Sequence, residues 1–531
     1  MANRTKYGYG FPETLNINDY TLDHVVRQGM GKNVALYFGD DRVTYLELQE
    51  RINRFGNALR KLNIQRGTHL LFRSHNCPEY WIGVLGAMKI GAVPVISNTL
   101  FRSRELEAII NSNQCVAVVT ERDYLGPLNQ VQPRCPSLKH VILVGDDAEK
   151  GELNFTDLLN SGGPELAAAR LHWRELGFII NTSGTTGEPK GVMHAHTWCW
   201  CWGKPFTEQM VRTGPESIVY QPQEISFSYP FGTLFFYPLM YGAASVLTPG
   251  RPRNEEDNFA IIQKYRVTHF YTVPTHYRIL LALENVESKF DLSSLTYCLS
   301  AGEPITVEHF NAWRRRFEVD ICDVIGQTEL HAFVGNLRGL PIKPGSMGKT
   351  IEPHIVTILD DNGNEAPPNK AGHLVVKEDD PGVCLGYKNM EESWRSVLKN
   401  GYYYTRDYAS RDEDGYYWYV SRSDDIIVSR GYLVSPKEVE DALAEHEAVF
   451  EPAVVASPDP TIGQKVKAFI TLKPGYEASD QLARQIIDYV KGRIAPYKAP
   501  REISFRSELP KTPTGKIQRK ALRDEELATS R

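Results

Sequence analysis

Ten residues between positions 182 and 191 combine three glycines, four hydroxyl residues and one lysine. Glycines let backbone N–H groups turn inward and come close to an anion, and hydroxyls add donors without bulk. Lys190 adds a mobile positive charge of the kind that follows a phosphate as it moves. The apolar residues 176–180 come directly before this segment and predict a buried strand, from which the loop leaves a sheet. The pattern predicts a polyphosphate-binding loop, with an ordinary polar turn as the alternative.

Two better-known motifs do not explain this segment. A Walker A loop requires a glycine five residues before Gly-Lys-Ser/Thr, and Lys343 stands at that place before Gly348. The Gly-x-Ser-x-Gly elbow of hydrolases surrounds neither Ser183 nor Ser300. A hydrolase nucleophile is therefore not indicated.

The composition is that of a globular protein with several folding units. The chain has 531 residues, of which 42% are hydrophobic, and a formal net charge of -5. We expect no nucleic-acid partner, because such proteins carry a broad basic footprint. The eight cysteines lack the paired spacing of a zinc site or a disulfide framework, so we expect reduced thiols. No signal-peptide core and no run of about 18 apolar residues occurs, which predicts a cytoplasmic protein without membrane insertion.

A sheet must hold the loop, and alternating helices and strands predict one. Residues 44–59 repeat apolar side chains at helical spacing behind a capping box formed by Thr44 and Glu47. Trp198, Trp200 and Trp202 lie far from any basic cluster, so we expect buried packing rather than a platform for bases. The alternation predicts parallel sheets flanked by helices. The further expected helices are 79–90, 103–111 and 258–265, and the expected strands are 69–72, 92–96, 116–120 and 269–273.

After about residue 345 short strands alternate with turns, which predicts a smaller β-rich subdomain. A second change follows residues 421–425, where Ser435, Pro436 and Glu438 supply an N-cap, a first-turn proline and a capping box for a new helix. We predict a boundary there, between domains 1–422 and 423–531. Residues 491–523 hold ten basic and two acidic residues. This segment is either a solvated face or a local phosphate-binding surface.

Six motifs occur in one fixed order. They are residues 182–191, Ser300-Ala-Gly-Glu303, Ile325-Gly-Gln-Thr-Glu329, Tyr404-Thr-Arg-Asp407, Ser421-Arg-Ser-Asp-Asp425 with Gly431, and Pro510-Lys-Thr-Pro-Thr-Gly-Lys516. Together they resemble the adenylate-forming superfamily of acyl- and aryl-CoA synthetases, luciferases and peptide-synthetase adenylation domains. The resemblance covers roughly residues 30 to 525. The overall sequence pattern is similar to that of benzoate-type and medium-chain acyl-CoA ligases.

The resemblance implies a fold and a two-step reaction. The fold is α/β: a large N-terminal domain of parallel α/β sheets with a β-rich subdomain, and a small mobile α+β C-terminal domain. A carboxylate attacks the α-phosphorus of ATP, pyrophosphate leaves, and a thiol then displaces AMP from the acyl-adenylate. The first step joins two anions, so that catalysis depends on positioning and charge neutralisation. The implied cofactors are ATP, Mg²⁺ and coenzyme A.

Each motif residue then takes an implied role in adenylation. Lys516 would stabilise the α-phosphate, with Thr328 near it, and Glu329 would bind Mg²⁺. Asp407 would accept hydrogen bonds from both ribose hydroxyls, and Arg422 would approach the same ribose. Taken singly, each of these residues is also explained as a solvated loop residue, an ion pair or an exposed lysine. The full set of implied ATP or AMP contacts is Thr182, Ser183, Gly184, Thr185, Thr186, Gly187, Lys190, Ala301, Gly302, Glu303, Gly326, Gln327, Asp407 and Arg422.

The second step is implied to need a movement of the C-terminal domain. Asp424 matches the hinge of the family, where a few residues absorb the change in φ and ψ. Gly431 matches the glycine that lines the pantetheine tunnel, with a plain turn glycine as the alternative. Arg430, Tyr432 and Lys491 are the other candidate CoA contacts.

The chain departs from the family pattern at several positions. Ile325 stands where many members have an aromatic residue, and benzoate-type ligases also have an aliphatic residue at this position. Arg406 replaces a common glycine before the ribose aspartate, which changes the expected turn geometry. Leu433 and Ile462 stand where related medium-chain enzymes carry arginines.

Two segments resemble the lining of the acyl pocket in benzoate-type ligases. Phe227, Tyr229, Ile325 and His331, with the backbone of Ala301 and Gly302, would enclose a compact ring. His331 has the alternative of a buried core histidine. The predicted function is an ATP-dependent acid–CoA ligase for an aromatic or alicyclic carboxylate. A medium-chain fatty acid–CoA ligase and a stand-alone adenylation enzyme that loads a carrier protein stay open, as does a homodimer.

Overall fold

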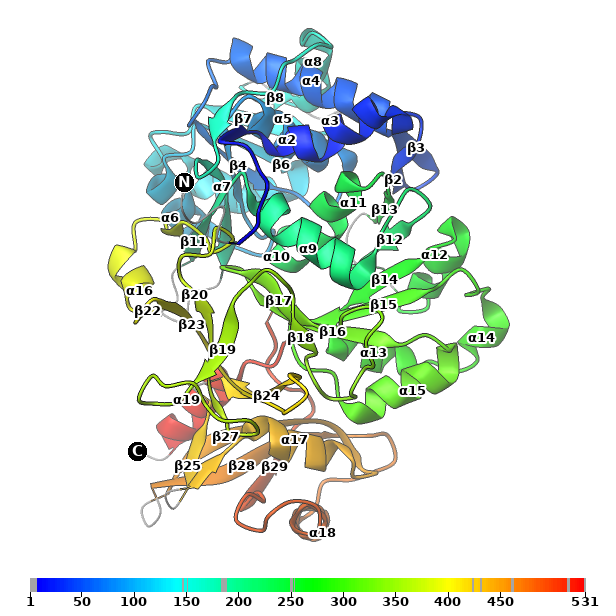
Figure 1. Cartoon of the computed structure of the whole chain (residues 1–531), viewed down its shortest axis with the longest axis vertical. Coiled ribbons are helices and arrows are strands. Elements are labelled where there is room, and N and C mark those ends of the chain that lie inside the picture. The colour runs from blue at the N-terminus through cyan, green and yellow to red at the C-terminus, as the bar shows by residue number, and fades with distance from the viewer. Residues whose placement is uncertain are drawn as a thin grey trace.

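The computed structural model contains two large sheets, a five-stranded sheet and a C-terminal domain with a sheet of its own (Figure 1). The N-terminal sheets lie at the top of Figure 1 and the C-terminal domain lies at the bottom. No helix in the described ranges is long and apolar enough to cross a membrane. The described residues are 7–145, 148–149, 151–182, 189–248, 252, 254–422, 425–429, 432–459, 463–512 and 516–529.

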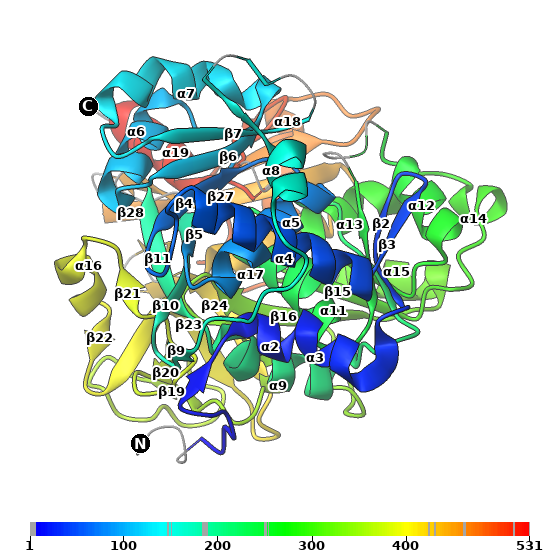
Figure 2. The ribbon, with the colours of Figure 1, turned by 90° about the horizontal axis from the view of Figure 1, so that it is seen from above.

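The first large sheet carries the strand that precedes the glycine–hydroxyl loop. Its inner strands are parallel, whereas β10 pairs with β11, and β11 with β21, in antiparallel fashion. Helices α4 (Tyr45–Lys61), α5 (Pro78–Lys89) and α8 (Phe155–Ser161) pack on one face, and α6 (Ser103–Asn113) and α7 (Leu125–Val131) on the other (Figure 2). In sheet order the strands are β21 (Gly386–Tyr387), β11 (Lys190–Ala195), β10 (Leu176–Thr182), β5 (Val93–Ile96), β4 (His69–Arg73), β6 (Ala117–Glu121), β7 (His140–Val144) and β8 (Leu153–Asn154).

The second large sheet carries two more of the motifs. Its central strands are parallel and both edges are antiparallel. The helices that cover its outer face are α12 (Asp257–Tyr265), α13 (Pro274–Leu281), α14 (Val286–Lys289) and α15 (Val307–Phe317). In sheet order the strands are β18 (Lys349–Thr350), β17 (His331–Gly335), β16 (Ile321–Gln327), β15 (Tyr297–Ala301), β14 (His269–Thr272), β12 (Ile218–Tyr220), β13 (Ala244–Leu247), β2 (Val34–Phe38) and β3 (Asp41–Thr44).

Several short helices, helical turns and a small sheet complete the N-terminal part of the chain. A two-stranded sheet joins β1 (Thr14–Leu15) to β9 (Leu171–His172). The short helices are α2 (Ile17–Tyr20), α3 (Leu22–Val25), α9 (Lys204–Phe206), α10 (Ser228–Pro230) and α11 (Tyr237–Met240). The helical turns are η1 (Val26–Met30), η2 (Arg122–Tyr124), η3 (Gln132–Arg134), η4 (Cys199–Gly203), η5 (Thr207–Val211) and η6 (Phe231–Phe236).

The third sheet is the predicted β-rich subdomain. It is antiparallel throughout and contains two motifs on adjacent strands. Helix α16 (Glu391–Arg395) precedes its short strand β22. The strands are β19 (Val356–Leu359), β20 (Gly372–Lys377), β23 (Tyr402–Arg411), β22 (Leu398–Lys399) and β24 (Tyr417–Arg422).

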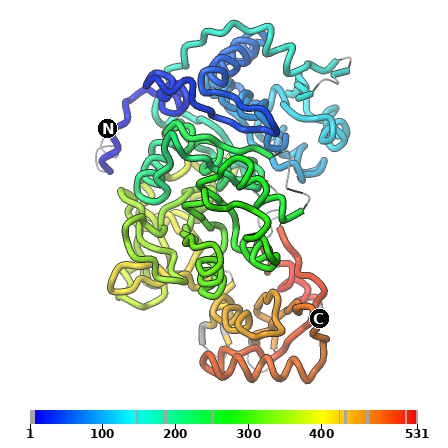
Figure 3. Tube along the Cα trace, turned by 90° about the vertical axis from the view of Figure 1, so that its right-hand side faces the viewer, coloured from blue at the N-terminus to red at the C-terminus, as the bar shows by residue number. Residues whose placement is uncertain are grey.

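The C-terminal domain is built around its own five-stranded sheet and stands apart below the other sheets (Figure 3). Two apolar clusters, one on each side of this sheet, form its cores. The predicted boundary after Arg422 stays a prediction, although the last strand of the third sheet ends at that residue. The elements are β25 (Ile427–Ser429), β26 (Tyr432–Val434), α17 (Pro436–Ala444), β27 (Val449–Asp459), β28 (Gly463–Leu472), α18 (Asp480–Lys491), β29 (Glu502–Phe505) and α19 (Arg519–Thr529).

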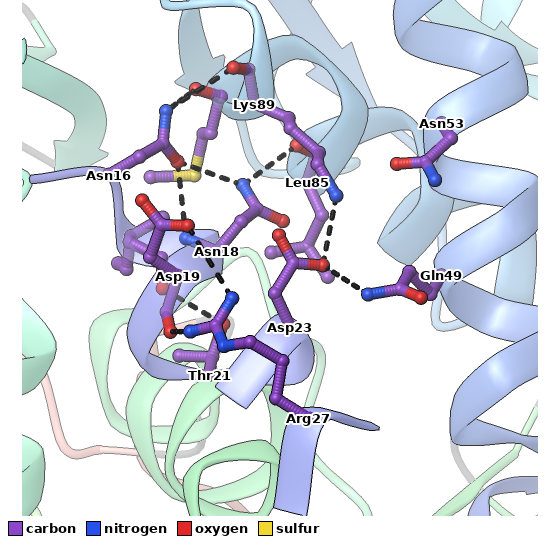
Figure 4. A network of polar contacts seen from close by, with 12 residues as sticks. Asn16, Asn18, Asp19, Thr21, Asp23, Arg27, Gln49, Asn53, Leu85 and Lys89 are labelled. Carbon is purple, nitrogen blue, oxygen red and sulfur yellow. Dashed lines mark hydrogen bonds and ion pairs between the residues drawn. The ribbon is translucent and has the colours of Figure 1, made fainter. Parts of the chain in front are cut away.

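The N-terminal segment is fixed to α5 by a buried polar network (Figure 4). Asn16 donates from Nδ2 to the carbonyl of Met88, and Lys89 Nζ lies 2.9 Å from Asp23 Oδ1. The side chains of Lys89 and Asp23 are 2% and 9% exposed. Gln49 on α4 donates to the same carboxylate oxygen at 2.6 Å. One buried carboxylate thus joins α3, α4 and α5.

Most of the predicted elements exist within a few residues of their expected bounds. The capping box of Thr44 and Glu47 is confirmed. The second predicted box is half wrong: Ser435 accepts from the Glu438 N–H, but the Glu438 carboxylate accepts from Lys498 instead. A tertiary ion pair has replaced the local bond. The buried role of two of the three tryptophans is confirmed, since Trp198 and Trp202 are 2% and 0% exposed.

The expectation of parallel sheets holds for the centres of both large sheets and fails at their edges. Strand β11 runs back from the loop beside β10, and β17 runs back beside β16. Short chain reversals of this kind can make only antiparallel pairs, because a parallel pair needs a long crossover. These two reversals carry two of the motifs.

Candidate active site

The proposed ribose site is a hydrogen-bonded trio on three strands. Gln327, at the end of β16, donates from Nε2 to Asp407 Oδ2 at 2.6 Å. Arg422 Nη1 lies 3.1 Å from Asp407 Oδ1, because the two residues are register partners on β23 and β24. Asp407 is buried, which raises the pKa of its carboxyl, while the positive charge of Arg422 opposes that rise. The carboxylate is held in one orientation.

The residue before this aspartate has a left-handed backbone. Arg406 has a φ of 65°, a conformation that non-glycine residues adopt with strain. The family pattern has a glycine at this position, and the geometry supplies the reason for it. Arg406 thus adopts a φ that a glycine would adopt without strain, while the expected change in the local turn geometry stays a prediction.

The proposed magnesium residue and the loop lysine meet at a tyrosine that the sequence did not indicate. The hydroxyl of Tyr387 donates to Glu329 Oε1 at 2.6 Å. Lys190 Nζ lies 5.2 Å from the centre of the same ring. Tyr387 is 4% exposed, so that its hydrogen bond and its cation–π contact are both shielded from water.

Local backbone geometry explains this meeting. Thr182 and Lys190 are register partners at the ends of β10 and β11, so the loop between them closes a hairpin. Strand β21 pairs with β11 and brings Tyr387 beside Lys190. Burial lowers the pKa of Lys190, and the carboxylate of Glu329 opposes that shift. The other predicted loop residues, Ser183, Gly184, Thr185, Thr186 and Gly187, lie outside the described residues.

Glu329 sits in a tight turn between antiparallel strands. Gln327 pairs with His331, which leaves three residues, including Thr328 and Glu329, to reverse the chain. Gly326 precedes the turn, and a Cβ there would lie 2.2 Å from the His331 carbonyl oxygen. Any larger residue would force the two strands apart, so glycine is required at this motif position.

Lys516 of the C-terminal domain reaches the N-terminal site. A Cβ on Gly302 would lie 2.9 Å from Lys516 Cε and 3.2 Å from its Nζ. Gly302 also has a φ of 96°, in the region that favours glycine. Because β15 and β16 are parallel neighbours, Gly302 after β15 lies at the same sheet edge as Gln327. The aliphatic end of Lys516 therefore occupies the space that the glycine leaves open.

The charges around Lys516 are those of the proposed nucleotide site. Burial lowers the pKa of Lys516, while the carboxylates of Glu303 and Asp407 oppose that shift and Arg422 adds to it. Burial raises the pKa of Glu303, and Lys516 is the largest opposing charge. The structure thus brings Lys516, Glu303, Asp407 and Arg422 within electrostatic range of one another.

Part of the predicted acyl lining lies beside this site. The hydroxyls of Ser228 and Thr328 lie 3.2 Å apart, which links the segment after Phe227 to the Glu329 turn. Tyr229 donates to the carbonyl of Leu299 at 3.3 Å. The predicted lining residues are half-buried at Phe227, Tyr229 and Ile325 and buried at Ala301.

His331 is a buried histidine in an aromatic cluster. Its Nδ1 is 2.9 Å from the hydroxyl of Tyr237, and its ring meets Trp198 edge-on at 5.1 Å. Burial lowers the pKa of His331 to about 4, so its imidazole is neutral. Its Nε2 is the nearest atom to a Cβ built on Gly232, at 2.5 Å. These contacts fit the core alternative, while its predicted place in the acyl pocket stays a prediction.

Among the predicted CoA contacts, the described residue Lys491 lies away from this site. Lys491 ends α18, at the bottom of Figure 1, and pairs there with Asp488. Tyr432 begins β26. Asp424, Arg430 and Gly431 lie outside the described residues. The hinge and tunnel roles therefore stay predictions.

The comparisons with known proteins identify the family. The profile of the AMP-binding enzyme family matches residues 22–388, and that of the AMP-binding enzyme C-terminal domain matches residues 438–516. The chain belongs to the AMP-binding enzyme family. It is an AMP-forming acyl-CoA synthetase of the adenylate-forming superfamily, as the motif order indicated.

Named relatives cover almost the whole chain. The human acyl-coenzyme A synthetase ACSM3, mitochondrial, is 33% identical over 98% of this chain and 91% of its own length. The acetyl-coenzyme A synthetase of Bacillus subtilis (strain 168) is 34% identical over 97% of this chain and 91% of its own length.

Solved structures confirm the fold at similar coverage. The anthranilate CoA ligase AuaEII in complex with anthranoyl-AMP is 33% identical, with a TM-score of 0.92 and 100% of both chains covered. A benzoate CoA ligase from Burkholderia xenovorans LB400 is 29% identical, with a TM-score of 0.87, covering 96% of this chain and 100% of its own.

Proposed function

We propose that this enzyme activates an aromatic or alicyclic carboxylic acid as its acyl-CoA thioester. The observation that carries the proposal is the approach of Lys516 to Gly302, beside the buried Asp407 that holds Gln327 and Arg422. The similarity to an anthranilate CoA ligase and a benzoate CoA ligase supports the choice of acid. The half-buried Tyr229 and Ile325 supply the flat and branched surfaces that suit a ring.

In the first step the acid oxygen forms a bond to the α-phosphorus of ATP, and the bond from that phosphorus to pyrophosphate breaks. Asp407 accepts hydrogen bonds from the ribose hydroxyls and fixes the nucleotide. Lys516 places its ammonium group beside the α-phosphate, where negative charge increases. Lys190 binds the leaving phosphates. The aromatic ring of Tyr387, 5.2 Å from Lys190 Nζ, helps to hold the ammonium group in place.

Glu329 is suited to hold Mg²⁺. Its Oε1 accepts from Tyr387, and within the described ranges no hydrogen bond engages its Oε2. No cluster of three or more His, Cys, Asp or Glu side chains able to hold a metal occurs in the part of the chain that the structure describes. A single carboxylate together with substrate phosphates is a common environment for Mg²⁺. When bound, the ion would neutralise phosphate charge and orient the leaving group.

In the second step the sulfur of CoA forms a bond to the acyl carbon, and AMP leaves with the electron pair of the anhydride bond. Gly431 would line the path of the thiol, with Arg430, Tyr432 and Lys491 as contacts for the nucleotide of CoA. Asp424 would serve as the hinge. Because Lys491 lies on α18, this step needs a second arrangement of the C-terminal domain.

A short or medium-chain fatty acid is the second candidate substrate. The 34% identity to an acetyl-coenzyme A synthetase favours it. A single methylene changes binding in an apolar pocket by only about 1–3 kcal/mol, so related acids compete closely. We also propose a cytoplasmic location. The alternative is a mitochondrial location, because some relatives are named mitochondrial.

Pyrophosphate release across a panel of acids tests the proposal. The panel contains benzoate, aminobenzoates, cyclohexanecarboxylate, acetate, butyrate and octanoate, each with no thiol, with CoA and with a carrier protein. We expect the highest kcat/KM with a ring acid, and AMP release that depends on CoA. A preference for octanoate or acetate would select the second candidate, and turnover with carrier protein but not CoA would contradict a CoA ligase.

A further inference from the structure

A buried carboxylate in the C-terminal domain bridges two positive charges. Glu451, near the start of β27, is 2% exposed. Its Oε1 lies 2.6 Å from Arg278 Nη2, and its Oε2 lies 2.8 Å from Lys511 Nζ. A buried carboxylate is costly unless it is paired, so both contacts matter to this arrangement.

The two cations come from different domains. Arg278 belongs to α13, which covers the second large sheet, and its side chain is 19% exposed. Its guanidinium also lies 5.8 Å from the ring of Phe450, which belongs to the C-terminal domain. Lys511 belongs to the same domain as Glu451 and would stay beside it in any arrangement. A movement of the C-terminal domain away from α13 would therefore leave Glu451 with one partner in place of two.

Lys511 links this carboxylate to Lys516. An isolated β-bridge joins Lys511 to Ile517, and the N–H of Thr512 donates to the Lys516 carbonyl at 2.7 Å. The N–H of Lys516 donates in return to Thr512 Oγ1 at 3.1 Å. These bonds hold the backbone of Lys516 beside that of Lys511 and Thr512. The ion pair between Lys511 and Glu451 therefore also restrains the backbone of Lys516, from which its side chain extends.

We propose that Arg278 and Glu451 are positioning residues that hold the C-terminal domain where Lys516 reaches the nucleotide. This inference rests on the proposed role of Lys516 in adenylate formation. The ion pair stabilises the adenylating arrangement and contributes nothing to an arrangement in which the domains have moved apart. It therefore favours the first step and has no part in the second.

Substitution of one partner predicts a split between the two steps. Arg278→Gln is expected to lower the rate of adenylate formation on the order of 30-fold, because truncating one side of a buried charged pair is costly. That factor corresponds to about 2 kcal/mol. Thioester formation from supplied acyl-adenylate and CoA should stay within about two-fold of the unmodified rate, and Arg278→Lys should restore part of the first step.

The experiment uses the full-length enzyme, with both half-reactions measured separately. Glu451→Gln should give the same split, and the double variant Arg278→Gln/Glu451→Gln should be hardly worse than either single variant, as expected for one shared interaction. Arg134→Gln is the matched control, because Arg134 pairs with Glu107 on the surface, within the N-terminal domain. Additive losses, equal losses in both steps or an unchanged first step would each overturn the proposal.

A distance measurement tests the pair without catalysis. All eight native cysteines are buried, so that cysteines introduced at the exposed Glu216 and Glu477 can carry spin labels selectively. We expect Arg278→Gln to broaden the label distance distribution and Arg134→Gln to leave it unchanged. An unaltered distribution in Arg278→Gln contradicts the proposal. If the unmodified enzyme releases no pyrophosphate with any acid, the proposed function fails, and this measurement still decides the role of the pair.

Discussion

At the scale of single residues, the site is a series of side chains that hold one another rather than a row of independent contacts. Tyr387 joins Lys190 to Glu329, and Gln327 joins the turn that carries Glu329 to Asp407. A charged group held by a neutral donor keeps its orientation before the substrate arrives, which is the condition for electrostatic catalysis. The strength of these supporting contacts can be measured one at a time.

Tyr387→Phe removes the hydroxyl that donates to Glu329 and keeps the aromatic ring beside Lys190. A hydrogen bond to a charged group contributes about 1.5–3 kcal/mol, so we expect the Mg²⁺ concentration for half-maximal pyrophosphate release to rise about ten-fold. The measurement is an Mg²⁺ titration at fixed ATP. Tyr241→Phe is the control, since Tyr241 donates to Glu208 away from the site. An unchanged Mg²⁺ dependence would exclude a role for the hydroxyl.

The pH dependence of adenylation should report Lys516. In the proposed mechanism its charged form stabilises the phosphate, and burial lowers the pKa of Lys516 in the folded enzyme. The lysine therefore loses its proton at a lower pH than a free lysine, whose pKa is about 10.4. We expect the rate of pyrophosphate release to decline on the alkaline side below that value. Lys516→Arg should move the decline to higher pH, and identical profiles for both enzymes would contradict the assignment.

At the scale of elements, the N-terminal segment depends on one buried ion pair. Lys89→Met leaves the Asp23 carboxylate buried without its charged partner, while the amide of Gln49 still donates to it. We expect a loss of about 3–5 kcal/mol in the free energy of unfolding of this part of the molecule, measured by urea denaturation.

The control for that experiment is an exposed ion pair. Lys264→Met breaks a contact with Asp40, whose side chain is 96% exposed, and should cost far less stability than Lys89→Met because water screens the pair. Lys89→Met combined with Asp23→Leu should recover part of the stability, because no unpaired charge remains. Equal losses for Lys89→Met and Lys264→Met would show that burial of the pair does not matter.

At the scale of the whole molecule, the proposed active site combines Lys516 of the C-terminal domain with Gly302 of the second large sheet. Lys516→Ala should reduce adenylate formation by a factor of about 10²–10³, the usual cost of a lost charge-stabilising donor. Thioester formation from supplied acyl-adenylate should continue, because the proposed second step uses another arrangement of the domains and does not require Lys516. Separate assays of pyrophosphate release and of thioester formation measure the two effects. Equal loss in both assays would argue against a division of labour between two arrangements.

The amino-acid sequence by itself determined the elements and the motif positions. Local signals suffice there: Thr44 and Glu47 cap a helix within one turn, and the apolar residues 176–180 form the expected buried strand. The resemblance also placed Asp407 and Arg422 at one ribose, whereas their pairing on adjacent strands came from the structure. Even the strained Arg406 departed from the family pattern in the sequence, although only the backbone gave its φ.

The tertiary structure decided which distant residues meet. Spacing along the chain contains no information on the pairing of Glu329 with Tyr387, or of Arg278 with Glu451. Nothing in the sequence distinguished Tyr387 or Glu451 from other tyrosines and glutamates, because their roles depend on burial and on partners supplied by other sheets. For Lys516 and Gly302 the resemblance implied a shared nucleotide, and the structure supplied the close approach of the two residues. Neighbouring residues along the chain determine the backbone dihedral angles, whereas the packing of sheets and domains determines the distances between side chains that are far apart in the sequence.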